Sequence, residues 1–378
     1  MSGKYGRAIL LFGFAMNAGL SYVQLSVRDL FAREKVVALD AYHGHDELNN
    51  GQCSMIPRFD SACSDIAFSG NEAFMACSSY DDRLAFYPPG GRNNESARMQ
   101  WQDPLWRYNI DTKKLDKIEL EGVDELVHHG LAIYESSDDP NEIRLFIGSH
   151  GRNQSSVNIF KHTRGTMRAT LVRSVYNYFV VTPNSIQPTG PDSYYVTNDH
   201  KFRSGPLREI EDRLGHWRWG SVVHCDITQN FTCRPCATSL ARAHGIVQSG
   251  DKTYVADFVS GKIRVYKEGP EHRLDLVDTV LVGSVVEHLT PLSNGNFLIA
   301  AMPEHEYAKQ WVKDHVTKAP SMVLVFDVSS NTIRPVFHDS TFGSATVAAM
   351  DPKQKVMLLG GSYSSGVLRC EANSRWQL

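Results

Sequence analysis

A run of three polar residues follows an aromatic, β-prone segment near the middle of the chain. Tyr194-Tyr195-Val196-Thr197 is typical of a buried strand, and Asn198, Asp199 and His200 come directly after it. A strand that ends in this way presents an amide, a carboxylate and an imidazole beyond its tip. These groups can bind a metal, hold a substrate oxygen or move a proton. The simpler interpretation is a strand followed by an Asx-type turn.

Histidines recur next to glycine or glutamate in similar settings. The pairs are His129-Gly130, His150-Gly151, His244-Gly245 and Glu287-His288. In a propeller, the starts of the innermost strands converge on a central tunnel. On that fold these residues would form one site with Asn198 and Asp199. Histidines that are simply exposed or hydrogen-bonded are the alternative.

The elements that must position these groups are short β segments separated by turns. The predicted strands are 73–77, 144–147, 157–160, 194–197, 221–225, 253–256, 262–266, 296–300, 322–326 and 356–360. Helical periodicity is confined to the N-terminus and to 207–214 and 305–315. Many short strands at similar spacing predict an all-β sandwich, barrel or propeller. Repeated pairs of strands, such as 253–258 with 262–266, favour the propeller.

The composition is that of an ordinary folded protein. The chain has 378 residues, of which 42% are hydrophobic and 21% charged, and its formal net charge is −3. No basic stripe is present in the sequence, so we do not expect nucleic acid as a partner.

The first 30 residues differ from the rest. Lys4 and Arg7 precede the apolar run 8–16, which predicts a signal peptide or an uncleaved signal-anchor over residues 1–30. Asn17 and Ser21 make this a poor membrane span, and a buried N-terminal helix is the alternative. We therefore expect the secretory pathway, with the protein secreted or anchored in the lumen of the endoplasmic reticulum or a vesicle. Any membrane association would run through the leader.

Two further features agree with export. Acceptor triplets for N-glycosylation begin at Asn94, Asn153 and Asn230. The seven cysteines would mostly pair in an oxidising compartment, and their odd number leaves at least one free. The pairing of Cys225, Cys233 and Cys236 stays open, and Cys233-Arg234-Pro235-Cys236 is either a loop disulfide or a chance spacing.

At this point the chain resembles the paraoxonase/arylesterase family. The resemblance rests on the segment 195–202, on His129-Gly130-Leu131, and on 147–150, 261–266 and 343–348, in order from about Cys53 to Cys370. Cys63, Cys77 and the segment 207–212 are more similar to the fungal branch. The resemblance implies a six-bladed β-propeller over residues 40–378, closed by a disulfide between Cys53 and Cys370, with Cys63 and Cys77 also paired. It also implies two calcium ions in the tunnel and hydrolysis of lactones and aryl esters.

The family's site carries over only in part. By resemblance, Asp65, Asp199 and the carbonyl of Leu131 would hold one structural calcium, and all three supply oxygen. The family's histidine pair falls on His129 and His150, and two amides of the second site fall on Asn198 and Asn184. Three other positions of that second site have changed, to Ser64, to His244 and to Glu287-His288. Imidazole is a poor calcium ligand, so we expect a softer divalent ion or no ion at the second site; calcium with waters completing its shell is the alternative.

These changes lead to three hypotheses. The first is an enzyme of fungal specialised metabolism with a rebuilt tunnel. This would be a hetero-Diels–Alderase that joins a tropolone quinone methide to a humulene-type polyene, with catalytic residues His129, His150, Asn198, His244, Glu287 and His288. The second is a calcium-dependent lactonase or arylesterase with His129 as base, assisted by His150. The third is a propeller that binds apolar small molecules without turnover.

A hydrophobic small molecule is the expected partner in all three hypotheses. The residues predicted to contact it are Ser64, Asn184, His200, Trp217, Trp219 and Ser344. Trp217 and Trp219 follow the Asn-Asp-His run, where the family places a lid over the tunnel mouth. Packing of these two rings within a blade is the alternative.

Overall fold

The strands follow one another along the chain as antiparallel groups of four. The computed structural model describes residues 48–136, 138–214, 218–228, 231–303, 307, 310, 314, 317–372 and 376. The first three groups are β2 (Ala62–Ser69), β3 (Glu72–Ser78), β6 (Leu105–Asn109) and β7 (Leu115–Glu121); β8 (His128–Glu135), β9 (Glu142–His150), β10 (Ser155–Thr163) and β11 (Arg168–Val175); and β12 (Pro183–Gly190), β13 (Ser193–Asn198), β14 (Gly220–Asp226) and β15 (Thr232–Leu240).

Three more groups complete the described part of the chain. They are β16 (Ala243–Ser249), β17 (Lys252–Asp257), β18 (Lys262–Glu268) and β19 (Leu274–Leu281); β20 (Val285–Pro291), β21 (Phe297–Met302), β22 (Ser321–Asp327) and β23 (Thr332–Asp339); and β24 (Val347–Met350), β25 (Val356–Gly361) and β26 (Ser364–Glu371) with β1 (Cys53–Met55). The expectation of an all-β fold is confirmed.

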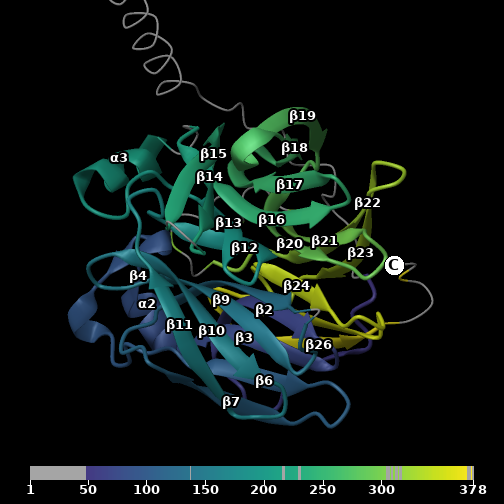
Figure 1. The fold of residues 1–378 in the computed structure, drawn as a ribbon. Coiled ribbons are helices and arrows are strands. Elements are labelled where there is room, and N and C mark those ends of the chain that lie inside the picture. The colour runs from purple at the N-terminus through teal and green to yellow at the C-terminus, as the bar shows by residue number, and fades with distance from the viewer. Residues whose placement is uncertain are drawn as a thin grey trace, which may run out of the picture.

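The first strands of these units form a closed ring. Along the chain β2 contacts β8, β8 contacts β12, and so on through β16, β20 and β24, which contacts β2 again. Figure 1 shows the units placed around a common centre, with β2, β12, β16, β20 and β24 toward the middle. Edge pairings of β26 with β2 and of β7 with β11 join three units into one twelve-stranded sheet. The arrangement is propeller-like.

The ring is closed by the two ends of the described chain. Strand β1 adds to the edge of β26, so that the last unit contains strands from both ends. The disulfide Cys53–Cys370 joins the same two strands across 317 residues of sequence. This bond and the predicted bond between Cys63 and Cys77 are both confirmed.

The remaining described cysteines pair across strands. Cys225 in β14 is bonded to Cys233 in β15, and Cys236 is a buried free thiol. Burial raises the pKa of Cys236 to about 11, so this thiol stays protonated and unreactive at neutral pH. The segment Cys233–Cys236 is therefore not a disulfide loop, because its first cysteine pairs eight residues earlier in the sequence.

The apolar core lies between the units. In six buried clusters, each combines residues from two neighbouring units, as Phe146 of β9 and Tyr194 of β13 do between the second and third. The second and third strands of each unit are therefore covered on both faces by neighbouring units. This burial explains why their sequences are nearly all apolar. The core holds the ring together and leaves its centre to polar side chains.

Short segments cover one end of the ring. Helix α2 (Tyr80–Ala85) begins at Ser79, whose hydroxyl accepts the N–H of Asp82 at 3.2 Å. It is followed by β4 (Phe86–Tyr87), the 3-10 turn η1 (Pro88–Gly90), β5 (Arg92–Asn93) and the turn η2 (Glu95–Ala97). Helix α3 (Pro206–Leu214) matches the helix predicted at 207–214, and the turns η3 (Phe258–Ser260) and η4 (Pro270–His272) lie in the fourth unit.

Some predictions fall outside the described residues. These are the leader at 1–30, most of the helix predicted at 305–315, and the residues Trp217 and Asn230. In the part of the chain that is described, no helix has the length and apolar character needed to cross a membrane. Asn94 and Asn153 are both exposed, so the prediction of glycosylation at these two sites stands.

Candidate functional site

The candidate site is built from β-bulges at one level of the ring. In five of the first strands, the pairing with the second strand shifts near the start of the strand. The residues at these shifts are Ser64, His129-Gly130, Asn184-Ser185, His244-Gly245 and Glu287-His288. A bulge places two residues opposite one and redirects their side chains. The predicted site residues therefore converge because the same bulge recurs in successive units.

The glycine of the His-Gly pairs is needed for this close approach. A Cβ at Gly130 would lie 2.1 Å from the carbonyl oxygen of Asn184 in the next unit. A Cβ at Gly245 would lie 2.3 Å from the backbone nitrogen of Leu289. Both contacts are with backbone, so the neighbouring strands would have to separate. The repeated pattern is thus a requirement of ring packing that also carries two histidines to the centre.

A small central cavity lies at this level. Its volume is about 50 Å³, and its lining includes His129, Asn184, Asp199, His244 and Glu287. Tyr87, Pro89 and Gly90 line it from the segment that covers this end of the ring, and Tyr363 lines it from the last unit. The guanidinium of Arg208 in α3 donates to the carbonyl oxygen of Pro89 at 2.7 Å. This hydrogen bond holds the covering segment against α3 at this end of the ring.

His129 and His150 form a buried pair. The Nδ1 of His129 lies 3.0 Å from the Nε2 of His150, and that Nε2 also lies 3.0 Å from the carbonyl oxygen of Pro183. Because a carbonyl only accepts, we assign the proton of His150 to Nε2. The Nδ1 of His129 then accepts, and His129 carries its own proton on Nε2. The hydroxyl of Ser155 lies 3.3 Å from Nδ1 of His150 and can donate to it. Each hydrogen bond of the two rings then has one donor and one acceptor.

The surroundings keep both rings neutral. Burial lowers the pKa of His150 to about 3, and burial together with the neighbouring His150 holds the pKa of His129 well below its usual range. A neutral His129 with its proton on Nε2 is a hydrogen-bond donor. His129 is less suited to act as a base. Its Nε2 would then have to lose its proton and its Nδ1 would donate to Nε2 of His150, whose lone pair would also face the carbonyl oxygen of Pro183.

A second pair joins the fourth and fifth units. The Nδ1 of His244 lies 2.9 Å from Oε2 of Glu287, and the imidazole stacks on Phe258 with ring centroids 4.3 Å apart. The carboxylate accepts from the imidazole and so fixes the proton of His244 on Nδ1. The other oxygen of Glu287, Oε1, is buried without a hydrogen-bond partner among the described residues. This pair can therefore take up or deliver a proton in the cavity.

The expected calcium site is occupied by nitrogen donors instead. Oδ2 of Asp65 accepts the backbone N–H of Leu131 at 2.6 Å and lies 3.0 Å from Nε2 of His288. Oδ1 accepts the N–H of Ile66 at 2.8 Å. Burial lowers the pKa of His288, but the carboxylate of Asp65 more than compensates and raises it overall. Both oxygens of Asp65 thus face donors, and Leu131 contributes its N–H.

Asp199 is held in the same way. Its Oδ1 lies 2.8 Å from Nδ1 of His200, and its Oδ2 accepts the amide of Asn184 at 3.4 Å. The far side of the same imidazole, Nε2, lies 3.1 Å from Asp212 in α3. Burial raises the pKa of Asp199, but the adjacent His200 holds it well below its usual range. Asp212 is the one member of this chain of contacts that the sequence did not suggest.

These donor sets do not fit a hard cation. The described residues contain no group of three or more His, Cys, Asp or Glu placed to hold a metal. Calcium requires several oxygen ligands, whereas the carboxylates of Asp65 and Asp199 already accept from imidazoles and amides. As they are paired, the carboxylates of Asp65 and Asp199 do not offer the oxygen ligands that the calcium predicted at Asp65, Leu131 and Asp199 needs.

Other predicted residues have structural contacts. Asn198 accepts the N–H groups of Val181 and Thr182 at 2.9 Å and donates to the carbonyl oxygen of Phe179. Ser344 is buried in a turn, where its hydroxyl accepts the N–H of Ala319 at 3.0 Å. These hydrogen bonds occupy polar atoms of Asn198, which was predicted to be catalytic, and of Ser344, which was predicted to contact the substrate.

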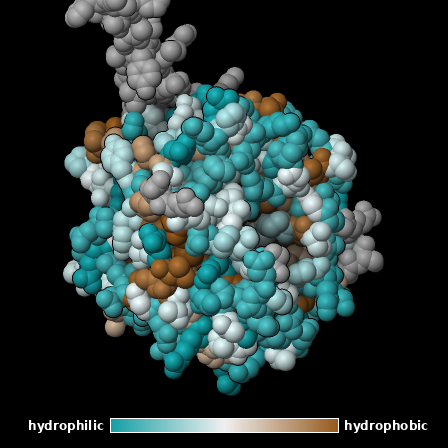
Figure 2. Space-filling model, viewed as in Figure 1, coloured by the Kyte–Doolittle hydropathy of each residue, from teal (hydrophilic) through white to brown (hydrophobic). Residues whose placement is uncertain are grey.

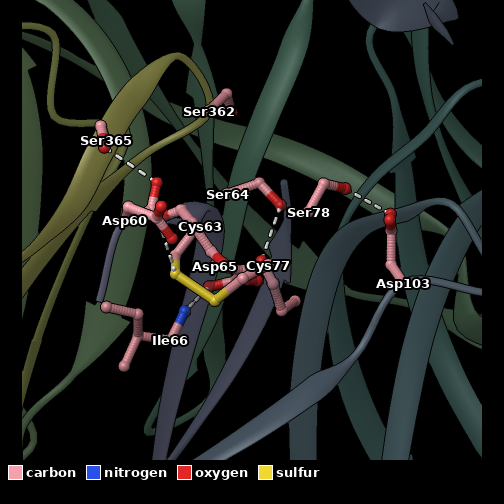
Figure 3. Close-up of a disulfide and its surroundings, with 12 residues drawn as sticks. Asp60, Cys63, Ser64, Asp65, Ile66, Cys77, Ser78, Asp103, Ser362 and Ser365 are labelled. Atoms are coloured by element: carbon pink, nitrogen blue, oxygen red, sulfur yellow. Dashed lines mark hydrogen bonds between the residues drawn. A yellow bond between two sulfur atoms is a disulfide. The ribbon is translucent and has the colours of Figure 1, made fainter. Parts of the chain in front are cut away.

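Ser64 lies at the wall of the ring. Its hydroxyl donates to the carbonyl oxygen of His129 at 2.7 Å. Figure 3 shows it beside Asp65 and next to the disulfide Cys63–Cys77, which joins β2 to β3 below the bulge. The serine therefore links the first two units at the place where the family would have an acidic ligand.

A wide groove lies next to the covered cavity. Its volume is about 1030 Å³, and Tyr176, Tyr178, Phe179 and Trp219 line it together with His200. The side chain of Tyr178 is 88% exposed. The molecular face in Figure 2 is mostly hydrophilic, with apolar side chains gathered in a few patches. His200 lines both the groove and the central cavity and therefore lies between the two spaces.

The fold and site together define an all-β, propeller-like protein with a polar centre on its first strands. A family model described as arylesterase matches residues 105–372. The chain therefore belongs to the arylesterase family.

Individual relatives agree with this assignment. The chain is 25% identical over 258 residues to serum paraoxonase/arylesterase 2 of Rattus norvegicus, with 64% of this chain and 68% of the relative covered. It is 27% identical over 251 residues to the Bos taurus protein of the same name, with the same coverage. A luciferin-regenerating enzyme of known structure matches with a TM-score of 0.51 at 10% identity, covering 85% of this chain and 95% of the other, and supports the fold alone.

Several site residues were missed by the sequence interpretation. Tyr87, Phe258 and Tyr363 line the cavity, and Arg83 lies beneath Tyr87 with its guanidinium carbon 4.1 Å from the ring centroid. All four lie outside the first strands. No spacing or motif in the sequence links them to the histidines, because covering segments join the site only through the closed ring.

Proposed function

We propose that this protein is an enzyme that acts on a hydrophobic small molecule through orientation and hydrogen bonding at the centre of a six-bladed propeller. The six four-stranded units would be its blades. Family membership supports an enzyme, since the relatives are named as paraoxonases and arylesterases. The changed centre supports a reaction different from metal-assisted hydrolysis.

The observation that carries this proposal is the proton arrangement of His129. The carbonyl of Pro183 makes His150 a donor, and His150 in turn makes His129 a neutral donor through Nε2. A donor held in a dry cavity stabilises an oxygen that gains negative charge in the transition state. The pair His244–Glu287 supplies a second polar contact in the same cavity.

The specific reaction we propose is a hetero-Diels–Alder addition in fungal specialised metabolism. A tropolone quinone methide would add to one double bond of a humulene-type polyene, forming one C–C and one C–O bond with no net proton transfer. The carbonyl oxygen of the quinone methide gains charge as the bonds form, and His129 would donate to it. The groove of about 1030 Å³ can hold the apolar polyene next to the cavity, which supports catalysis by orientation.

The test is stereochemical. The purified protein is incubated with a quinone methide generated in situ and with humulene, and the product enantiomers are separated by chiral chromatography. We expect the wild-type protein to form one enantiomer in excess over the racemic background. In His129→Ala the rate of this catalysed reaction should fall roughly 10²-fold. His129→Gln keeps an N–H donor and should retain part of the activity. A racemic product at the background rate would refute the proposal.

Hydrolysis of a lactone or aryl ester is the second candidate. This candidate rests on the intact pair of His129 and His150, 3.0 Å apart, and requires the other proton arrangement, in which His129 carries its proton on Nδ1 and its Nε2 is the base. The check is release of phenol from phenyl acetate and ring opening of δ-valerolactone, with and without chelator. Turnover that chelator abolishes would return the protein to calcium-dependent hydrolysis. If neither reaction occurs, the third hypothesis, a propeller that binds apolar molecules without turnover, takes their place.

A further inference from the structure

A second cavity lies in the ring beyond the bulges, on the side away from the covered site. Its volume is about 320 Å³, and its lining residues come from all six first strands and the turns that follow them. The central cavity is lined by residues near the starts of these strands, such as His129 and Asn184. The second cavity is lined by residues further along them, such as Ile133 and Ile186. We call this space the axial funnel.

A polar floor separates the funnel from the central cavity. It consists of the ion pair between Asp65 and His288 and the hydroxyl of Ser185, which lies 3.2 Å from Nε2 of His288. In the bulges of β12 and β20, the first residue lines the central cavity and the second lines the funnel: Asn184 and then Ser185, Glu287 and then His288. The bulges therefore create two back-to-back sites.

The walls and mouth of the funnel are mainly apolar, and Gln187, Thr290 and Ser293 are the polar residues among them. Ile66, Leu131, Ile246 and Leu289 are buried near the floor. Pro291 and Pro352 are exposed and line the space at its outer end. Burial thus decreases from the floor outward, as in a pocket open to solvent. A cavity of this size falls within the usual range for small-molecule sites.

We propose that the axial funnel binds an uncharged, mainly apolar small molecule that carries one hydroxyl or carbonyl group. The apolar walls would take up the body of the ligand. The carboxylate of Asp65 already accepts three donors and is balanced by His288, so a charged ligand would lose its hydration without gaining a partner. The hydroxyl of Ser185 is the group at the floor that can donate or accept.

The test uses the full-length protein and the neutral fluorescent probe N-phenyl-1-naphthylamine, displaced by 1-octanol. Wild type should bind the probe saturably, and octanol should displace it from the funnel. Thr290→Trp and Ile133→Trp each add a ring at a half-buried wall position and should weaken binding at least tenfold. Val172→Trp, on the exposed outer strand β11, is the matched control and should bind as wild type.

Two further variants separate the three cavities. His244→Ala alters the central cavity and Tyr178→Ala alters the groove, and both should leave probe affinity unchanged. Absence of saturable binding, wild-type affinity in folded Thr290→Trp and Ile133→Trp, or loss of binding in Tyr178→Ala would each overturn the proposal. If the tryptophan variants do not fold, a crystal soaked with 8-bromo-1-octanol decides by the position of the bromine: inside the funnel supports the proposal, elsewhere refutes it.

Discussion

Replacing His288 tests the claim that an imidazole, not calcium, neutralises Asp65. In His288→Asn the carboxylate of Asp65 keeps its contacts with two backbone N–H groups but loses its charged partner 3.0 Å away. Breaking a buried ion pair by removing one partner costs about 3 kcal/mol or more. For a chain of this size that loss lowers Tm by about 5 °C.

The assay is thermal unfolding in the presence of chelator or millimolar calcium. We expect the Tm of wild type to be the same in both conditions, because Asp65 and Asp199 already accept from nitrogen donors. His288→Asn should unfold at a lower temperature in chelator and recover part of the loss in calcium. The new amide oxygen would then add an oxygen ligand beside the carboxylate of Asp65.

A matched control separates this effect from the loss of any buried histidine. His162 is fully buried in β10, the third strand of its unit. Its Nδ1 lies 2.8 Å from the carbonyl oxygen of Arg168. His162→Asn should also lower Tm but should gain nothing from calcium. A wild-type Tm that falls in chelator, or stoichiometric calcium in purified wild type by elemental mass spectrometry, would refute the reasoning.

Three other predictions concern the orientation of His244, covalent closure and pH. Glu287→Gln removes the carboxylate that orients His244 at 2.9 Å, so the imidazole no longer holds its polar contact with the substrate, and turnover by the folded variant should fall at least tenfold; unaltered turnover would remove this pair from the mechanism. Cys370→Ser opens a loop of 317 residues and should lower the free energy of unfolding by about 5 kcal/mol in urea titrations; equal stability would mean that the bond does not form. Burial lowers the pKa of His128 and of His224 to about 4 from 6.5, so the stability from each neutral ring is complete above pH 6.5 and is lost as pH falls toward 4, by roughly 1 kcal/mol per pH unit for each ring. His128→Phe should flatten this acid dependence, and an identical pH profile would contradict the assignment.

The strands that the sequence revealed are second and third strands of the units, although the third strands of the first and last units, β6 and β26, were not predicted. All ten predicted segments overlap such strands, for example 144–147 in β9 and 157–160 in β10. These strands are covered on both faces by neighbouring units, so burial selects a continuous apolar run. The fourth strands escaped prediction because they are largely exposed, as most of β19 is, and their composition is mixed.

The first strands were missed as strands for another reason. Each bulge interrupts the alternation of side chains and inserts polar residues, as His129-Gly130 does in β8. Sequence reasoning did single out these residues, and it placed them near the axis of a propeller. It could not see that the interruption itself marks the strand, because a bulge shows only in the pairing of two strands.

The sequence by itself determined the fold class, the family and most of the residues that converge. The apolar runs of the buried strands and the His-Gly pairs follow from local packing, and both can be recognised in short stretches of consecutive residues. Only the tertiary structure decided what the residues do. In the folded chain Asn198 hydrogen-bonds to backbone groups, and Asp65 pairs with His288. The carbonyl of Pro183 fixes the proton of His150 and thereby makes His129 a donor. These outcomes depend on distances between groups far apart in the chain, and such distances exist only once the ring has closed.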